Sequence, residues 1–283
     1  MDERIYILPR RTLRGFYYMK TNSWLVVISI FIMLLVWQLV AWFGGFPAFI
    51  LPSPEMVGIR FTQAIADGSL LRNTAVTLGE VLAGLVLGVI VATVLGYLLA
   101  RSLKLERLLS PYIIASQSIP IVAIAPLLVI WFGPGLFSKI LVCALIVFFP
   151  VLVNTVVGVR SVPEDLRDLM RSLQATRWQT LQYLELPAAL PVFLGGLRIG
   201  ATLSVIGAVV GEFVGADSGL GFLVNVGRGI YDTSLVFVAV FTLIAMALIL
   251  YGSVSLVEKR LLKWQQQQEF RVLLNSEAQS KAG

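Results

Sequence analysis

The sequence WLVVISIFIMLLVWQLVAWF occupies residues 24–43 and contains no charged side chain. A helix needs about 20 apolar residues to cross the hydrocarbon core of a bilayer, and this run has that length. It lies behind a long N-terminal tail, and no small-residue cleavage site follows it, so we expect a permanent span and not a cleaved signal peptide. The chain is therefore predicted to be a membrane protein.

The composition of the whole chain supports this prediction. Hydrophobic residues make up 58% of the 283 positions and charged residues only 13%, whereas about a quarter of a soluble domain is charged. This imbalance excludes an ordinary cytosolic enzyme, a disordered protein and a nucleic-acid binder. The chain has no histidine and a single cysteine, Cys143, which excludes histidine-based zinc sites, Ser-His-Asp triads and intrachain disulfides.

Five further apolar runs follow the first, and together they predict an all-α protein with six transmembrane helices. Each run is long enough to span a bilayer, although the second of these five carries three prolines. Six spans leave little chain for a soluble domain. The five runs cover residues 75–100, 108–131, 140–159, 190–214 and 235–257.

The 22 lysine and arginine residues indicate the orientation of these spans. Most of them lie in the N-terminal tail, in the second-to-third and fourth-to-fifth connections, and in the C-terminal tail, which the positive-inside rule places in the cytoplasm. Both termini are thus expected to be cytoplasmic. Lys139 is assigned to an external connection, and Glu80 is expected at the outer membrane interface.

We divide the chain into four parts. A cytoplasmic tail with an interfacial helix precedes the first span and its extracytoplasmic segment, a transmembrane domain with a cytoplasmic loop at 160–187 follows, and a second cytoplasmic tail ends the chain. The boundaries are 1–23, 24–72, 73–257 and 258–283.

Small residues recur at every fourth position in two spans. In a bilayer, where no hydrophobic force brings helices together, small side chains allow the close backbone approach that associates them. The pattern indicates a tight bundle or a dimer seam, and it does not distinguish between them. The residues are Gly84, Gly88, Ala92 and Gly96, and then Gly196, Gly200, Ser204 and Ala208, followed by Gly211.

The loop at 160–187 predicts two short amphipathic helices. The first is expected to begin at a capping box from Ser161 to Glu164, and the second at another from Thr176 to Gln179, ending before Pro187. Such a pair can dock into a groove on a soluble partner; the alternative is a hairpin that only joins two spans. On the first helix we expect Asp168 and Arg171 to be exposed, and Leu169, Met170 and Leu173 to be partly buried.

The residues of this loop resemble a known motif. Asp168-Leu169-Met170, Gln174, Leu184 and Leu186-Pro187 match the spacing of the EAA loop of bacterial ABC importer permeases, and the resemblance covers residues 73–257. This chain departs from the motif twice, with Asp168 in place of its Glu and Gln174 in place of its Gly. Leu51-Pro52-Ser53-Pro54 and Trp131-Phe132-Gly133 resemble the nitrate, sulfonate, taurine and vitamin-precursor subfamily.

The resemblance implies a type I importer of the bacterial inner membrane. Its expected partners are a second permease copy in a homodimer, two ATP-binding cassette subunits and an extracytoplasmic solute-binding protein. The chain lacks a Gly-x-x-x-x-Gly-Lys-Ser/Thr motif, so we expect ATP on the partner subunits, with no cofactor, metal or catalytic residue here. The residues expected to couple to the ATPase are Asp168, Leu169, Met170, Arg171, Gln174, Ala175 and Thr176.

Polar side chains near prolines in the spans are candidates for the translocation path, because broken helices are where transporters place their cargo sites. The alternatives are that these groups join helices, that Arg198 extends to the interface, and that Glu212 caps backbone groups. The solute is predicted to be a vitamin heterocycle, riboflavin or a thiamine pyrimidine precursor; the alternatives are an alkanesulfonate, taurine or nitrate, and more remotely a channel or a membrane scaffold. The path candidates are Gln117, Ser118, Asn154, Glu212 and Arg198.

Overall fold

A computed structural model describes residues 23–263, which form helices and no strands. The predicted interfacial helix and most of the C-terminal tail lie outside these residues. The helices are α1 (Ser23–Phe43), α2 (Pro54–Ala66), α3 (Ser69–Arg101), α4 (Leu103–Gln117), α5 (Ile121–Phe132), α6 (Leu136–Arg160), α7 (Glu164–Ser172), α8 (Arg177–Thr180), α9 (Leu186–Phe213), α10 (Leu220–Gly229) and α11 (Thr233–Leu261), with a π-helical turn, η2 (Leu181–Glu185), before α9.

Five stretches are long and apolar enough to cross a membrane, and they contain five of the six predicted spans. The predicted span at 108–131 is wrong as a single helix, because α4 and α5 meet at a bend of 95°. The bend lies at Pro120, which has no N–H to continue the ladder of α4 and disfavours helical backbone at the residue before it. Counting this bent pair as one span gives six.

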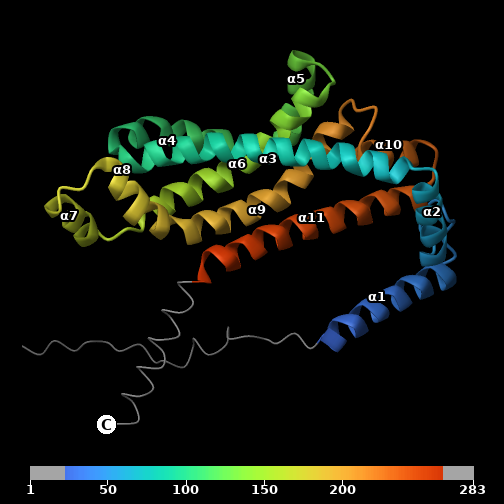
Figure 1. The fold of residues 1–283 in the computed structure, drawn as a ribbon. Helices are drawn as coiled ribbons and strands as arrows, with labels where there is room; N and C mark the ends of the chain where they lie inside the picture. Colours follow the sequence, from blue (N-terminus) through green and yellow to red (C-terminus); the bar gives the residue numbers. More distant parts are fainter. Residues whose placement is uncertain (1–22, 264–283) are drawn as a thin grey trace, which may run out of the picture.

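The centre of the bundle is α6, which lies between α3 and α9 (Figure 1). A Cβ on Gly207 would approach the Cα of Cys143 at 2.7 Å, and one on Gly200 would lie 3.2 Å from Val147. On the other side of α6, Gly84 and Gly88 of α3 face the same stretch of backbone. The two small-residue stripes therefore close a tight bundle within one chain, as one of the two predicted alternatives stated.

Different short helices lie at the two ends of the bundle (Figure 1). We call the end with α7 and α8 the loop end, and the end with α2 and α10 the opposite end. At the opposite end the Ser53 side chain accepts a hydrogen bond from Met56 N–H to begin α2, and Arg60 pairs with Asp232 at 2.7 Å.

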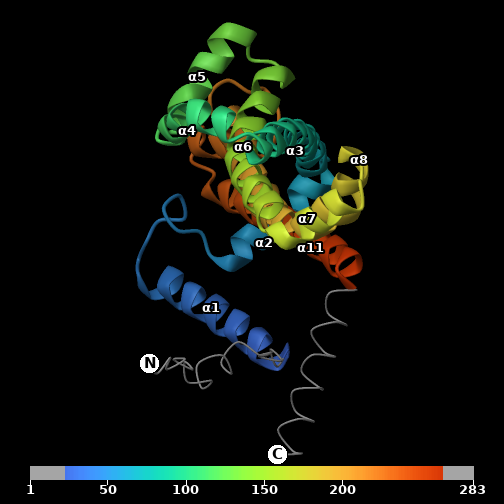
Figure 2. The same ribbon diagram turned by 90° about the vertical axis from the view of Figure 1, so that its left-hand side faces the viewer.

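Helix α1 lies apart from the bundle, as the end-on view in Figure 2 shows. Its apolar window has no buried residues. It reaches the bundle through Trp37, whose ring stacks on Phe237 of α11 at 5.2 Å and whose indole N–H donates to the Pro52 carbonyl. Most of the apolar surface of α1 therefore remains available to lipid.

Candidate functional site

The first helix of the loop, α7, carries charged residues on an exposed face. Arg171 pairs with Asp168 at 2.6 Å and with Glu164 at 3.3 Å, and all three side chains are more than half exposed. The predicted exposure of Asp168 and Arg171 is confirmed. The predicted capping box is wrong: Pro163 precedes α7 without a side-chain cap, and the Ser161 hydroxyl donates to the Gly158 carbonyl at the end of α6.

The apolar face of α7 is more exposed than predicted. Leu169 is 52% exposed and Leu173 67% exposed, and only Met170 is half-buried. The expectation of partial burial is wrong for the two leucines because the short loop projects beyond the ends of the spans, where no other part of residues 23–263 covers them (Figure 1). Large exposed apolar groups at a loop tip are typical of an interaction surface.

The turn after α7 is a Schellman motif. Gln174 N–H donates to the Arg171 carbonyl, and Ala175 N–H reaches back to the Met170 carbonyl. The motif requires left-handed backbone at its C′ residue, and Gln174 has a φ of 52°. This geometry explains physically why glycine suits the position, and why Gln174 can occupy it only at a conformational cost.

Replacing Gln174 with glycine is expected to stabilise the loop by about 0.5–1 kcal/mol, since the relief of left-handed strain exceeds the added freedom of the unfolded chain. Amide hydrogen exchange in α7 and α8 should slow by about two- to fivefold. The control Gln179→Gly, inside the second capping box, should speed exchange instead. Faster exchange in Gln174→Gly would contradict the assignment of strain to this residue.

The second helix of the loop continues into the membrane span. The capping box of Thr176 and Gln179 is confirmed, but the helix does not end before Pro187, because α8, η2 and α9 form one helical stretch from Arg177 to Phe213. In the wide turn η2, Leu186 N–H donates to the carbonyl of Leu181, five residues back. The widened turn accommodates a proline that would clash with a regular α-helical turn.

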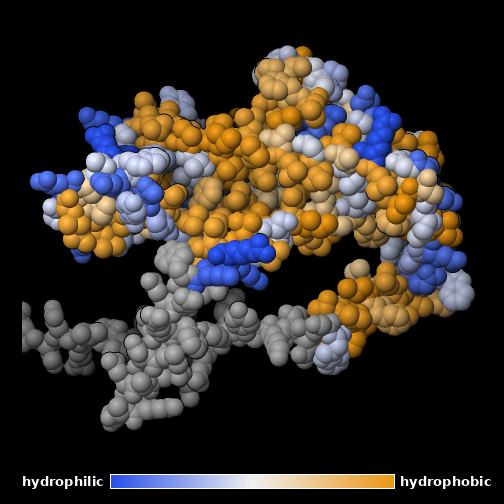
Figure 3. Space-filling view, in the orientation of Figure 1, coloured by the Kyte–Doolittle hydropathy of each residue, from blue (hydrophilic) through white to orange (hydrophobic). Residues whose placement is uncertain are grey.

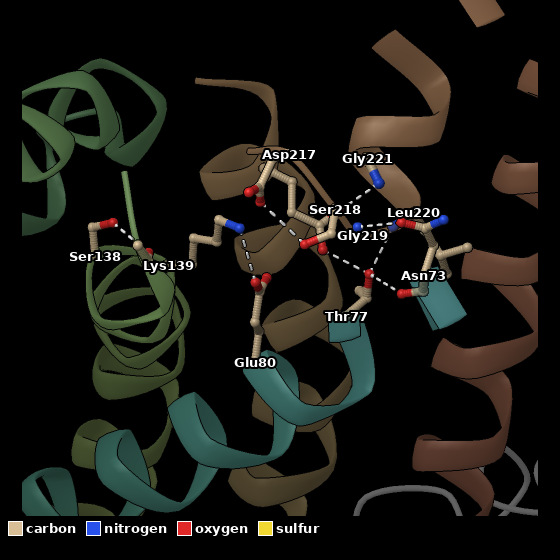
Figure 4. A network of polar contacts seen from close by, with 12 residues as sticks. Asn73, Thr77, Glu80, Ser138, Lys139, Asp217, Ser218, Gly219, Leu220 and Gly221 are labelled. Atoms are coloured by element: carbon tan, nitrogen blue, oxygen red, sulfur yellow. Dashed lines mark hydrogen bonds and ion pairs between the residues drawn. The ribbon is translucent and has the colours of Figure 1, made fainter. Parts of the chain in front are cut away.

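A network of buried polar groups holds the start of α10 at the opposite end (Figure 4). Three successive N–H groups, of Gly219, Leu220 and Gly221, donate to Asn73 Oδ1 at 2.7 Å, to Thr77 Oγ1 at 2.8 Å and to the Glu212 carboxylate. The Thr77 hydroxyl donates in turn to Glu212 Oε1 at 2.6 Å. Glu212 thus caps the first turn of α10. This is the predicted alternative in which Glu212 caps backbone groups. A negative charge is also favourable at a helix N-terminus.

An ion pair lies beside this network. Lys139 Nζ is 3.1 Å from Glu80 Oε1, and the side chains are 5% and 0% exposed. The expectation that Lys139 lies in an external connection is wrong, since α6 begins at Leu136, before the apolar run at 140. Glu80, expected at the outer interface, is buried inside the bundle against Lys139. The spacing of Asn73, Thr77 and Glu80, which share one helical face, is a signal that would have found the α3 side of this network.

The remaining path candidates are scattered along the chain. Arg198 pairs with Glu258 of α11 at 3.3 Å and lies over the Tyr251 ring. The Asn154 amide donates to the Pro150 carbonyl within α6, and the side chain packs on Gly196 of α9. Gln117 borders a groove of 190 Å³ between α4 and α6, and Ser118 is exposed at the bend. The structure does not bring these side chains together within one chain.

A polar cavity of 270 Å³ opens at the opposite end, beside the start of α3. Asp67 borders it and accepts a hydrogen bond from Ser69 N–H at 2.8 Å. Hydrogen bonds from Ser69 hold the pKa of the Asp67 carboxyl below its usual value, so the group is charged at neutral pH. The other lining residues are Gly68, Ser69, Arg72, Asn73, Asp217, Ser218 and Phe222.

Comparisons with known proteins all identify relatives that are membrane components of transport systems. A family model described as binding-protein-dependent transport system inner membrane component matches residues 84–263. The riboflavin transport system permease protein RibX of Chloroflexus aurantiacus is 49% identical over 84% of this chain and 89% of that protein. The formylaminopyrimidine transport permease protein ThiX of Halalkalibacterium halodurans is 36% identical, over 84% and 95%, and the taurine transport system permease protein TauC of Escherichia coli is 30% identical, over 91% and 95%.

The fold also matches a solved structure. The inward-facing MetNI methionine ABC transporter contains a chain that superposes with a TM-score of 0.63, covering 69% of this chain and 97% of that one. The sequences are 20% identical, so the match supports the fold alone. The superposed 69% of this chain therefore has the same fold as the matched chain of that transporter.

Proposed function

This chain belongs to the family of binding-protein-dependent transport system inner membrane components, and on that premise we propose that two copies form the translocation path of an importer for a flat vitamin heterocycle. The chain is the permease subunit of an ABC importer of the inner membrane. In the proposed complex two ATP-binding cassette subunits dock on the loops of the two copies, and a solute-binding protein delivers the cargo at the opposite end. ATP is bound by the cassette subunits.

Two features together support the docking proposal. The loop exposes apolar residues at α7, and its second helix is continuous with the membrane span α9. Leu169 of α7 and Leu173, which follows the helix, are exposed among residues 23–263, and an amphipathic helix binds a groove through such anchors. Behind them, the single helical stretch from Arg177 to Phe213 leaves no flexible link between loop and span. A movement of a subunit docked on α7 would therefore pass through the hydrogen-bonded turn at residues 173–176 to α8 and on to α9.

Replacing Leu169 and Leu173 together with aspartate is expected to weaken ATPase docking by about tenfold or more for each leucine, the worth of burying such a side chain. The change should leave membrane insertion normal, since surface substitutions seldom alter stability. The measurement is co-purification of the cassette subunit and cargo-stimulated ATP hydrolysis in proteoliposomes. The matched control, Leu169→Met with Leu173→Met, keeps the apolar surface and should retain both. Unchanged coupling in the aspartate variant would make the loop a plain connector.

Two observations support a heterocyclic solute over an anionic one. The relatives at 49% and 36% identity are permeases for riboflavin and for formylaminopyrimidine. In addition, Arg198 and Lys139 are each paired with a carboxylate, so neither offers an uncompensated positive charge to a sulfonate or nitrate. The amide of Gln117, before the bend, and the aromatic pair of Phe148 and Phe149 on α6 are groups that suit a flat solute with several hydrogen-bonding groups.

Uptake of riboflavin, a formylaminopyrimidine and taurine by the complete transporter tests this substrate class. Gln117→Leu is expected to reduce heterocycle uptake by about tenfold, the worth of one hydrogen bond to a buried polar ligand, whereas Arg198→Gln should affect uptake less. Taurine should not compete. If Gln117→Leu transports normally while Arg198→Gln abolishes transport at normal expression, the solute is an anion and the heterocycle proposal fails.

A further inference from the structure

Two cavities of opposite character adjoin at the loop end. The first has a volume of 380 Å³ and lies between α3, α6 and α9; its exposed lining surface is almost entirely apolar, although Thr93, Tyr97, Thr155 and Glu185 also border it. The second has a volume of 420 Å³ and lies between the end of α3 and the loop helices. Both are bordered by Glu185, so they share one wall.

The shared wall is itself electrically neutral. The buried Glu185 carboxylate accepts a hydrogen bond from Arg101 at 2.7 Å and one from the Tyr97 hydroxyl at 3.3 Å. The Arg101 guanidinium also lies over the Tyr97 ring, 5.3 Å from its centre. Because Arg101 compensates Glu185, this carboxylate does not cancel the other charges of the second cavity.

The second cavity retains an excess of positive charge. Four arginines line it, and of these Arg101 is paired with Glu185 and Arg171 with Asp168 and Glu164. In residues 23–263, Arg167 and Arg177 have no carboxylate partner. Arg167 donates one hydrogen bond to the Val159 carbonyl, and its buried Nε has no acceptor. Leaving a buried hydrogen-bond donor without an acceptor costs free energy. An anionic oxygen in this cavity could accept a hydrogen bond from Arg167 Nε and balance the positive charge of the two arginines.

The first cavity opens through an apolar rim. Val94, Leu98 and Leu186 line it and are 57%, 48% and 56% exposed, which is an environment for lipid chains and not for water. In the space-filling view, the loop end carries hydrophilic residues mixed with hydrophobic ones, next to the mostly hydrophobic surface of the spans (Figure 3). The basic lining of the second cavity therefore lies next to the apolar lining of the first, in the same order as the headgroup and acyl chain of a phospholipid.

We propose that the two adjoining cavities bind one anionic glycerophospholipid, with an acyl chain in the apolar cavity and the phosphate on Arg167 and Arg177. A molecule of this class has the required order of groups, an apolar chain next to a negative headgroup. Acidic lipids are attracted to arginines next to a span by about 1 kcal/mol, or fivefold in affinity, for each residue near the surface. Since Arg167 lies on α7 and Arg177 begins α8, the bound lipid would connect the two helices on which the ATPase is proposed to dock.

The test uses the purified full-length permease in detergent and native mass spectrometry. The probes are dioleoyl phosphatidylglycerol and dioleoyl phosphatidylcholine, which have the same chains and differ in net charge. The wild-type protein should retain phosphatidylglycerol preferentially. Arg177→Gln should reduce this preference by about fivefold, and Arg167→Gln with Arg177→Gln by about 25-fold. The matched control is Arg107→Gln, since this arginine lies on α4 at the same end but borders neither cavity, and it should leave the preference unchanged.

A second variant tests the apolar cavity separately. Leu98→Trp should fill its mouth and lower retention of both lipids while their ratio stays the same, and inorganic phosphate should not displace the bound lipid. An unchanged preference in the double arginine variant would overturn the proposal. Displacement by inorganic phosphate would show a free-anion site instead. If the double variant keeps its lipid preference but loses the cassette subunit on purification, the arginines serve protein docking and the proposal is wrong.

Discussion

Replacing Lys139 with methionine is expected to destabilise the folded bundle by about 3–5 kcal/mol, the usual cost of leaving one partner of a buried ion pair uncompensated. Glu80 is fully buried, and Lys139, at 3.1 Å, is its only ion-pair partner among residues 23–263. Without the lysine, the Glu80 carboxylate would remain in a low-dielectric site beside Glu212. The measurement is reversible unfolding of the full chain in mixed micelles.

Two further variants distinguish this cost from a general effect of losing a lysine. Lys104→Met removes an exposed charge after α3 and should change stability by less than about 0.5 kcal/mol. Lys139→Met combined with Glu80→Leu should recover most of the loss, because apolar replacement of a whole buried pair is often neutral. If the double variant is no more stable than Lys139→Met alone, the lysine acts by packing and not by charge compensation.

Replacing Gly207 with leucine is expected to prevent the close packing of α9 against α6. The first added carbon would lie 2.7 Å from the Cα of Cys143 and 3.3 Å from its backbone nitrogen. Backbone atoms in the middle of a packed helix cannot give way as a side chain can, so the cost should reach about 3 kcal/mol or more, the upper part of the range for overpacked cores. The expected result is loss of monodisperse folded protein, measured by size-exclusion chromatography after extraction from membranes.

The same helix offers a matched control. A Cβ on Gly195 has no atom within 4 Å, so Gly195→Leu should preserve the fold and improve helix propensity. Cys143→Ala should not rescue Gly207→Leu, because the closest atom belongs to the backbone and remains after the side chain is shortened. Normal extraction and assembly of Gly207→Leu would show that α6 and α9 are less closely packed than the glycine stripe indicates.

The sequence alone determined the class of this protein and most of its long helices. An uncharged run such as 24–43 is stable in a bilayer as a helix, because a helix satisfies its backbone hydrogen bonds within the segment. Local composition therefore decides the structure of these runs. The loop motif was also readable, because the capping residues Thr176 and Gln179 act within one turn. The resemblance at Asp168 to Pro187 led from there to the family.

The tertiary structure decided where these helices bend or continue and which of them pack against one another. The bend between α4 and α5 and the continuous helix across Pro187 depend on how neighbouring turns accommodate a proline, and the apolar pattern does not encode this. The pairing of Glu80 with Lys139 joins residues 59 positions apart, and burial of each charge is tolerable only because the other is there. The side on which a glycine stripe packs was likewise undecided until α6 was seen between α3 and α9, since small residues permit close approach without selecting the partner.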